Sequence, residues 1–208
     1  LVLLGSIFVA VSPSELIDAL SAVSPLTMLV AAGVFITVQT IAALNLYIFF
    51  TSFNNVSFPA VFRATWFGLA AGLITPGRIG EFSLVYFLQD AVDEGDTVAV
   101  AILDKALTVF VLLAYAAIGT YLYTSISAVS VIIVSIGFVL ITALLAVNPG
   151  VQTWLGNTLS YYGYETLRDH VIMAFDRLRS LARRPSVIGV NTALTFVKWG
   201  LTGAMFYT

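Results

Sequence analysis

The feature that most constrains this chain is the run from Leu26 to Phe50, which contains no Asp, Glu, Lys or Arg. A helix needs about 20 mostly apolar residues to cross the hydrocarbon core of a bilayer, so this run is long enough. The whole chain is 60% hydrophobic and 10% charged, whereas soluble domains are about 45–50% apolar and about 25% charged. We therefore expect an all-α, polytopic helical membrane protein, placed as a multi-pass protein in the cell (cytoplasmic) membrane.

Composition also excludes several classes of function. The chain has no Cys and one His, so thiol chemistry and Cys-based metal sites are ruled out, and no cofactor or metal is expected. A net charge of −2 does not favour nucleic acid as a partner. No Ser-His-Asp set or phosphate-binding loop is present, so we expect a transporter domain rather than an enzyme.

Other apolar runs divide the chain into one transmembrane domain. A short interfacial helix is predicted at 14–23 and a loop with interfacial aromatic residues at 148–164. Residue 1 is not a Met and lies in an apolar run, as does residue 208, so we expect a fragment truncated at both ends. The predicted spans are 1–11, 26–50, 97–123, 125–147 and 187–207.

The segment 165–184 differs from these spans because it is amphipathic. Leu167, Val171 and Leu178 belong to an apolar stripe, and most of its charged residues fall on the other side. This predicts a helix on the membrane surface. The segment holds five of the nine basic residues, so the positive-inside rule places it in the cytoplasm.

The segment 58–90 is apolar but is interrupted at 75–81 by Pro76, Gly77 and Gly80, which break helices. If the N-terminus is cytoplasmic, this segment enters and leaves by the same face as a re-entrant hairpin with Pro76 and Gly77 at its tip. If the N-terminus is outside, 58–76 is a full span and 80–90 an interfacial helix. We favour the hairpin, because its second limb is short and the break carries two opposite charges.

Charged residues also occur where charge is expensive. Arg78 and Glu81 flank the break, while Asp104, Lys105 and Lys198 lie well inside predicted spans. Each charge at the centre of a bilayer costs about 2.5–3.5 kcal/mol on insertion scales, so these residues must share a polar interior. We hypothesise a crossed pairing of Asp104 with Arg78 and of Lys105 with Glu81.

Two interpretations of these charges stay open. They could be ion pairs that only lock helices together, or they could bind an anion. The second is favoured by an excess of positive charge and by the free N–H groups of a broken helix. An anionic headgroup is the natural ligand of this set, which is Arg63, Arg78, Lys105 and Lys198 against Glu81 and Asp104.

Two further polar features have simpler interpretations. Asn45 could line the same cavity, but an isolated amide in a span more often joins two helices by a hydrogen bond. The acidic run from Asp90 to Asp96 departs from a calcium-binding pattern. It is better explained as a solvated loop with Asp96 as the N-cap of the next helix.

The sequence from Thr75 to Glu81, TPGRIGE, followed by the pair Asp104-Lys105, resembles the lysylphosphatidylglycerol synthase/flippase transmembrane-domain family. Members of that family have a PGRLGE-like break and then an acidic–basic pair, and the region of Lys198 resembles a later helix of the family. The family often has a second Arg soon after the Glu, which is absent here. The resemblance implies a suspected role for Pro76, Gly77, Arg78, Gly80, Glu81, Asp104 and Lys105.

The resemblance further implies translocation of an anionic phospholipid or a polyprenyl-phosphate-linked lipid across the membrane. Membrane lipids with anionic phosphate headgroups are the expected partners. A homodimer and a fused or separate soluble synthase or glycosyltransferase also stay open. The alternatives are the membrane half of a lipid-modifying enzyme, such as an aminoacyl-phosphatidylglycerol synthase or a lipid-linked glycosyltransferase, and a helical anchor for partner proteins.

Overall fold

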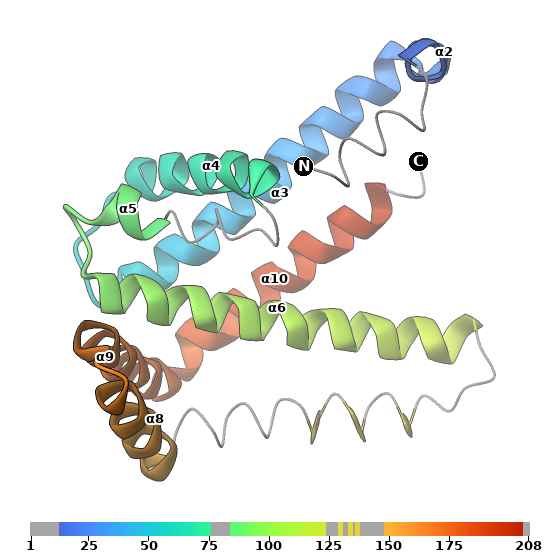
Figure 1. Cartoon of the computed structure of the whole chain (residues 1–208). Helices are drawn as coiled ribbons and strands as arrows, with labels where there is room; N and C mark the ends of the chain where they lie inside the picture. The colour runs from blue at the N-terminus through green and yellow to red at the C-terminus, as the bar shows by residue number, and fades with distance from the viewer. Residues whose placement is uncertain are drawn as a thin grey trace.

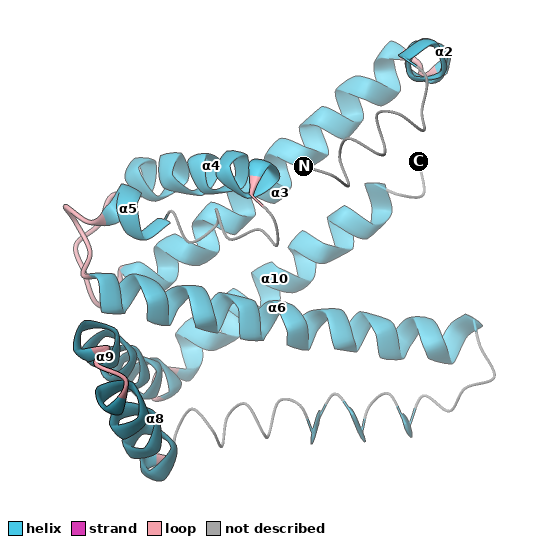
Figure 2. Ribbon diagram, in the orientation of Figure 1, coloured by secondary structure: helices cyan, strands magenta, loops and turns pink. Residues whose placement is uncertain are grey.

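A computed structural model describes residues 13–75, 84–123, 129–130, 133–134, 136–137 and 148–205 of the chain. Within these residues the regular structure is helical (Figures 1 and 2), which confirms the expected all-α fold. The named helices are α2 (Pro13–Ala22), α3 (Pro25–Phe50), α4 (Phe58–Ile74), α5 (Leu84–Leu88), α6 (Glu94–Tyr123), α8 (Pro149–Tyr161), α9 (Glu165–Ala182) and α10 (Pro185–Met205).

Most predicted helices are present with similar bounds. The runs 26–50, 97–123 and 187–207 correspond to α3, α6 and α10, and the amphipathic segment corresponds to α9. α3 and α6 are long and apolar enough to cross a membrane. The predicted span at 1–11 and most of the one at 125–147 lie outside the described residues.

The loop predicted at 148–164 is wrong, because most of it forms α8. The side chain of Asn148 caps this helix by accepting a hydrogen bond from the backbone N–H of Gly150 at 2.8 Å, and Pro149 occupies the first turn. Proline is favourable there, since its missing N–H would have no partner in the helix. Gly163, with a φ of 76°, then makes the turn into α9.

The helices pack around the long elements α3, α6 and α10. α10 lies against both α3 and α6, while α9 lies against α6 and α8. α4 packs on α3, and α5 packs on α4 and on α6. Figure 1 shows α8 and α9 together at the end of the molecule where α6 begins.

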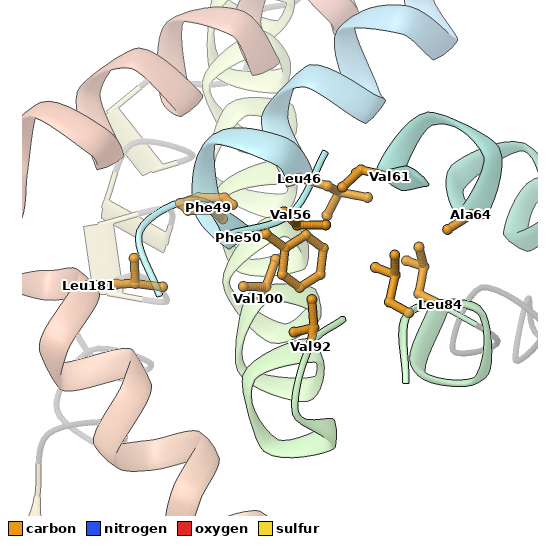
Figure 3. Packing of buried hydrophobic residues seen from close by; sticks show 11 residues of the cluster. Leu46, Phe49, Phe50, Val56, Val61, Ala64, Leu84, Val92, Val100 and Leu181 are labelled. Carbon is orange, nitrogen blue, oxygen red and sulfur yellow. The ribbon is translucent and has the colours of Figure 1, made fainter. Parts of the chain in front are cut away.

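The tightly packed core lies at that same end. It consists of the last turns of α3, the first turns of α4 and α6 with the loops before them, α5 and the last turn of α9. Phe49 and Phe50 are fully buried, and Figure 3 shows Phe50 close to Val92 and Val100. The cluster is formed by Leu46, Phe49, Phe50, Val56, Val61, Ala64, Leu84, Leu88, Val92, Val100 and Leu181.

Large apolar side chains are exposed away from this core. Leu26 and Leu29, in the first turns of α3, are 71% and 70% exposed, and Ile74, at the end of α4, is 82% exposed. So much exposed apolar surface is unfavourable in water. It must be covered by lipid or by a partner protein.

Candidate functional site

The break predicted as the centre of the site lies outside the described residues. This applies to Pro76, Gly77, Arg78, Gly80 and Glu81. The crossed pairing of Arg78 with Asp104 and of Glu81 with Lys105 therefore stays a hypothesis. The structure describes the two helices that flank the break, the α6 pair and the remaining basic residues.

The helices on either side of the break lie together. α4 ends at Ile74, α5 begins at Leu84, and α5 packs back along α4. The rings of Phe67 and Phe87 are stacked, with centroids 4.9 Å apart and planes 19° apart. The chain therefore reverses its direction between α4 and α5.

A hydrogen bond closes the base of this reversal. Asn54, in the loop before α4, donates from Nδ2 to Oδ2 of Asp96, in the first turn of α6, at 2.9 Å. The two residues flank the whole segment that contains α4, the break and α5. The two ends of the segment therefore lie at one place.

Asp96 itself departs from the sequence prediction. It was expected to cap a helix at the edge of a solvated loop, but α6 begins at Glu94 and Asp96 is only 1% exposed. Its Oδ1 lies 2.5 Å from Nε of Arg177 on α9. This contact is an ion pair, and Oδ1 accepts no hydrogen bond from the described residues.

A second arginine of the α9 region contacts the loop before α4, which also contains Asn54. Arg184, just after α9, donates from Nη1 to the backbone carbonyl of Ser52 at 2.9 Å. The guanidinium of Arg177 also lies 5.3 Å from the ring centroid of Phe53, within the range of a cation–π interaction. α9 is thereby fixed to the base of the hairpin at two points.

The other predicted site residues lie on α4, α6 and α10. Asp104 is half-buried on α6, Lys105 is exposed on the same helix, and Lys198 is half-buried on α10. Arg63 is exposed on α4, where its Nε donates to the carbonyl of its own helix at Pro59, 3.3 Å away. In the part of the chain that the structure describes, no ion pair joins Arg63, Asp104 and Lys198 to one another.

The helices that carry these charges do contact one another. The hydroxyl of Tyr115 on α6 donates to the backbone carbonyl of Phe196 on α10 at 2.9 Å. Beside Lys198, the indole Nε1 of Trp199 is buried and has no hydrogen-bond partner among the described residues.

Asn45 joins α3 to α10 rather than lining a cavity. Its Nδ2 donates to the hydroxyl of Thr195 at 3.0 Å, and that hydroxyl donates to the backbone carbonyl of Asn191 at 2.8 Å. All three residues are buried. The interpretation of Asn45 as a link between helices is confirmed.

The comparison with known families settles the class of the protein. A model of the lysylphosphatidylglycerol synthase TM region matches residues 1–208. The chain belongs to this family. No curated protein and no solved structure matches it significantly.

Membership of the lysylphosphatidylglycerol synthase TM-region family has two consequences. It confirms the resemblance seen around the break and the Asp104-Lys105 pair. It also makes the chain a membrane domain with a role related to membrane lipids, in agreement with its apolar helices.

Proposed function

We propose that this domain translocates lipids with an anionic headgroup across the cytoplasmic membrane. The headgroup passes a polar site at the tip of the hairpin, while the acyl or prenyl chains stay in the surrounding lipid. The family gives the membrane and lipid context, and the surplus of basic residues around the break favours an anion.

The observation that carries this proposal is the bond between Asn54 and Asp96 at the base of the hairpin. With both ends of the segment held together, the break falls where the chain reverses. α4 has 17 residues and is about 25 Å long at 1.5 Å per residue, so a hairpin set along the membrane normal would carry its tip most of the way across a hydrocarbon layer about 30 Å thick. Arg78 and Glu81 act at that depth in this proposal.

In this proposal each charge has a role. Arg78 and Lys105 bind the phosphate, and Glu81 and Asp104 orient these cations and weaken the binding enough for release. Lys198 and Arg63 raise the positive potential along the route. A charge deep in lipid needs a partner of opposite sign, so the polar site and the headgroup stabilise each other.

The test is transfer of a fluorescent anionic phospholipid between leaflets of proteoliposomes, with Arg78→Ala and Glu81→Gln compared to the wild type. We expect the initial rate to fall about ten-fold in each variant, as for loss of one charge-assisted hydrogen bond. Asp90→Asn is the matched control, since Asp90 is an exposed carboxylate near the base of the hairpin. Wild-type rates in both Arg78→Ala and Glu81→Gln overturn the proposal.

A second candidate is the membrane half of a lipid-modifying enzyme, because the matching family is described as the TM region of a synthase. In that case the domain presents lipid to a catalytic domain. The two functions are distinguished by expressing this domain alone and joined to a soluble synthase or glycosyltransferase domain, and comparing the lipids formed. A modified lipid formed only when the two are joined favours the enzyme.

A further inference from the structure

A groove with mostly polar lining residues lies between α8 and α9. Its volume is about 340 Å³, within the usual range for small-molecule sites. The two helices lie close together at Gly156, where a Cβ would be in ordinary van der Waals contact with Ile172 Cδ1 at 3.5 Å and with Arg168 Cγ at 3.8 Å. The groove is lined by Gln152, Thr153, Gly156, Asn157, Ser160, Arg168 and Ile172.

The single cation of this groove is already neutralised. Arg168 lies 2.7 Å from Glu165 Oε2 and 2.9 Å from Asp169 Oδ1. The hydrogen bond from Arg168 to Asp169, together with the charges of Asp169 and Glu165, raises the pKa of the guanidinium. These three side chains sum to −1, so the groove has no spare positive charge for a phosphate.

The remaining lining groups are suited to hydroxyl groups. Nε2 of Gln152 is buried without a hydrogen-bond partner among the described residues. Asn157 presents an exposed amide, and Ser160 donates its hydroxyl to Glu165 at 2.5 Å. Amides and hydroxyls can both donate to and accept from a ligand hydroxyl, and carboxylates can accept from it.

Exposed aromatic residues of α8 and of the turn after it indicate the depth at which such a ligand would be met. Trp154, Tyr161 and Tyr164 are 64%, 84% and 59% exposed on or just after α8. Aromatic residues of this kind concentrate at the membrane–water interface. We propose that the α8–α9 groove binds the uncharged, polyhydroxyl headgroup of a membrane glycolipid at the interface.

For the test, the full chain is purified in a detergent without a sugar headgroup and placed in nanodiscs. Native mass spectrometry then measures which lipids it retains. Monoglucosyl diacylglycerol, phosphatidylglycerol and phosphatidylcholine are supplied in equal amounts. We expect the wild type to retain the glucosyl lipid preferentially. Asn157→Leu and Gln152→Leu should each reduce that retention about five-fold, the equivalent of one hydrogen bond.

Thr158→Val is the control, because Thr158 bonds only the carbonyl of Trp154 within α8 and does not line the groove. It should retain the glucosyl lipid as the wild type does. If Asn157→Leu does not fold, Asn157→Ser replaces it with the same expectation. Equal retention of the three lipids, preference for phosphatidylglycerol, or unchanged retention in the groove variants overturns the proposal.

Free methyl glucoside distinguishes a lipid from a soluble sugar as the ligand. We expect the glucosyl lipid to stay bound in the presence of a large excess of the glucoside, since the lipid is concentrated in the plane of the membrane. Displacement at equimolar glucoside contradicts recognition of a lipid. Because the groove and the hairpin share no residue, a failure here leaves lipid translocation at the tip untouched.

Discussion

Arg177 on α9 neutralises the buried carboxylate of Asp96 on α6, with 2.5 Å between Nε and Oδ1. The two partners are unequal, because the side chain of Asp96 is 1% exposed and that of Arg177 is 40% exposed. Loss of the arginine would leave a buried anion with only the Asn54 amide beside it. Arg177 therefore matters more because it prevents an unpaired buried charge than because of its attraction to Asp96.

The first prediction concerns this asymmetry. Arg177→Ala should lower the free energy of unfolding by about 2–3 kcal/mol, below the 3–5 kcal/mol typical of a fully buried pair because Arg177 is partly solvated. The double variant Asp96→Asn/Arg177→Ala should recover most of that loss. Thermal unfolding in detergent measures both. Arg183→Ala, at an exposed position beside α9, is the control and should change stability by less than about 0.5 kcal/mol.

A second prediction tests the bond between α3 and α10. Asn45→Leu should destabilise the protein by about 1 kcal/mol, and a cycle with Thr195→Val should give a coupling of about 0.6 kcal/mol, typical of hydrogen bonds between membrane helices. Thr37→Val is the control, because Thr37 bonds a carbonyl of its own helix. Purely additive effects of the two substitutions would show that the bond does not join the helices.

A third prediction concerns the hairpin. The chain has no native Cys, so single cysteines report accessibility without background. Asn55→Cys and Asp90→Cys, at exposed positions on either side of the hairpin, should react with an impermeant maleimide from the same side of sealed vesicles. Asp18→Cys, on α2, should react from the opposite side, since α3 separates the two. Labelling of Asn55→Cys and Asp90→Cys from opposite sides would favour α4 as a full span.

A fourth prediction uses the contact between α6 and α9. A Cβ added at Gly95 would overlap the side chain of Met173, so Gly95→Ala should destabilise by about 1–2 kcal/mol despite the better helix propensity of Ala. Met173→Ala should relieve the overlap, making the double variant at least as stable as Met173→Ala alone. A further loss of stability on adding Gly95→Ala to Met173→Ala would contradict this explanation. Thermal unfolding of the three variants is the measurement.

The long helices could be predicted from sequence because their signal is local. Runs such as 26–50 contain no charged residue. Both the bounds of such a helix and its apolar character follow from the run itself, without knowledge of distant residues. α8 could not be predicted in the same way, since the composition of 148–164 indicates a loop, although the Pro at position 149 is favourable in a first helical turn. The preceding Asn148, a good N-cap, was the signal that could have corrected this.

The contacts of Asp96 could not be predicted from the neighbouring sequence, for a different reason. Asp90, Asp93 and Glu94, just before it in the sequence, are acidic and exposed, which favours a solvated loop. Its partners Asn54 and Arg177 lie in separate parts of the chain. Nothing in the spacing of three such residues indicates that they meet. One buried carboxylate in an acidic run leaves no periodic pattern. Asn45, by contrast, is an amide in an apolar helix, so a neighbouring helix or a cavity was its only expected partner.

The exposed half of α3 has a consequence for the bilayer around the protein. α3 has 26 residues and is about 39 Å long, whereas the hydrocarbon layer is about 30 Å thick. Its last turns are fixed in the core, while Leu26 and Leu29 are surrounded by little other protein. The excess length must therefore be accommodated by tilting of α3 or by local thickening of the bilayer around its exposed end. Changes in membrane thickness should affect that end of the protein most.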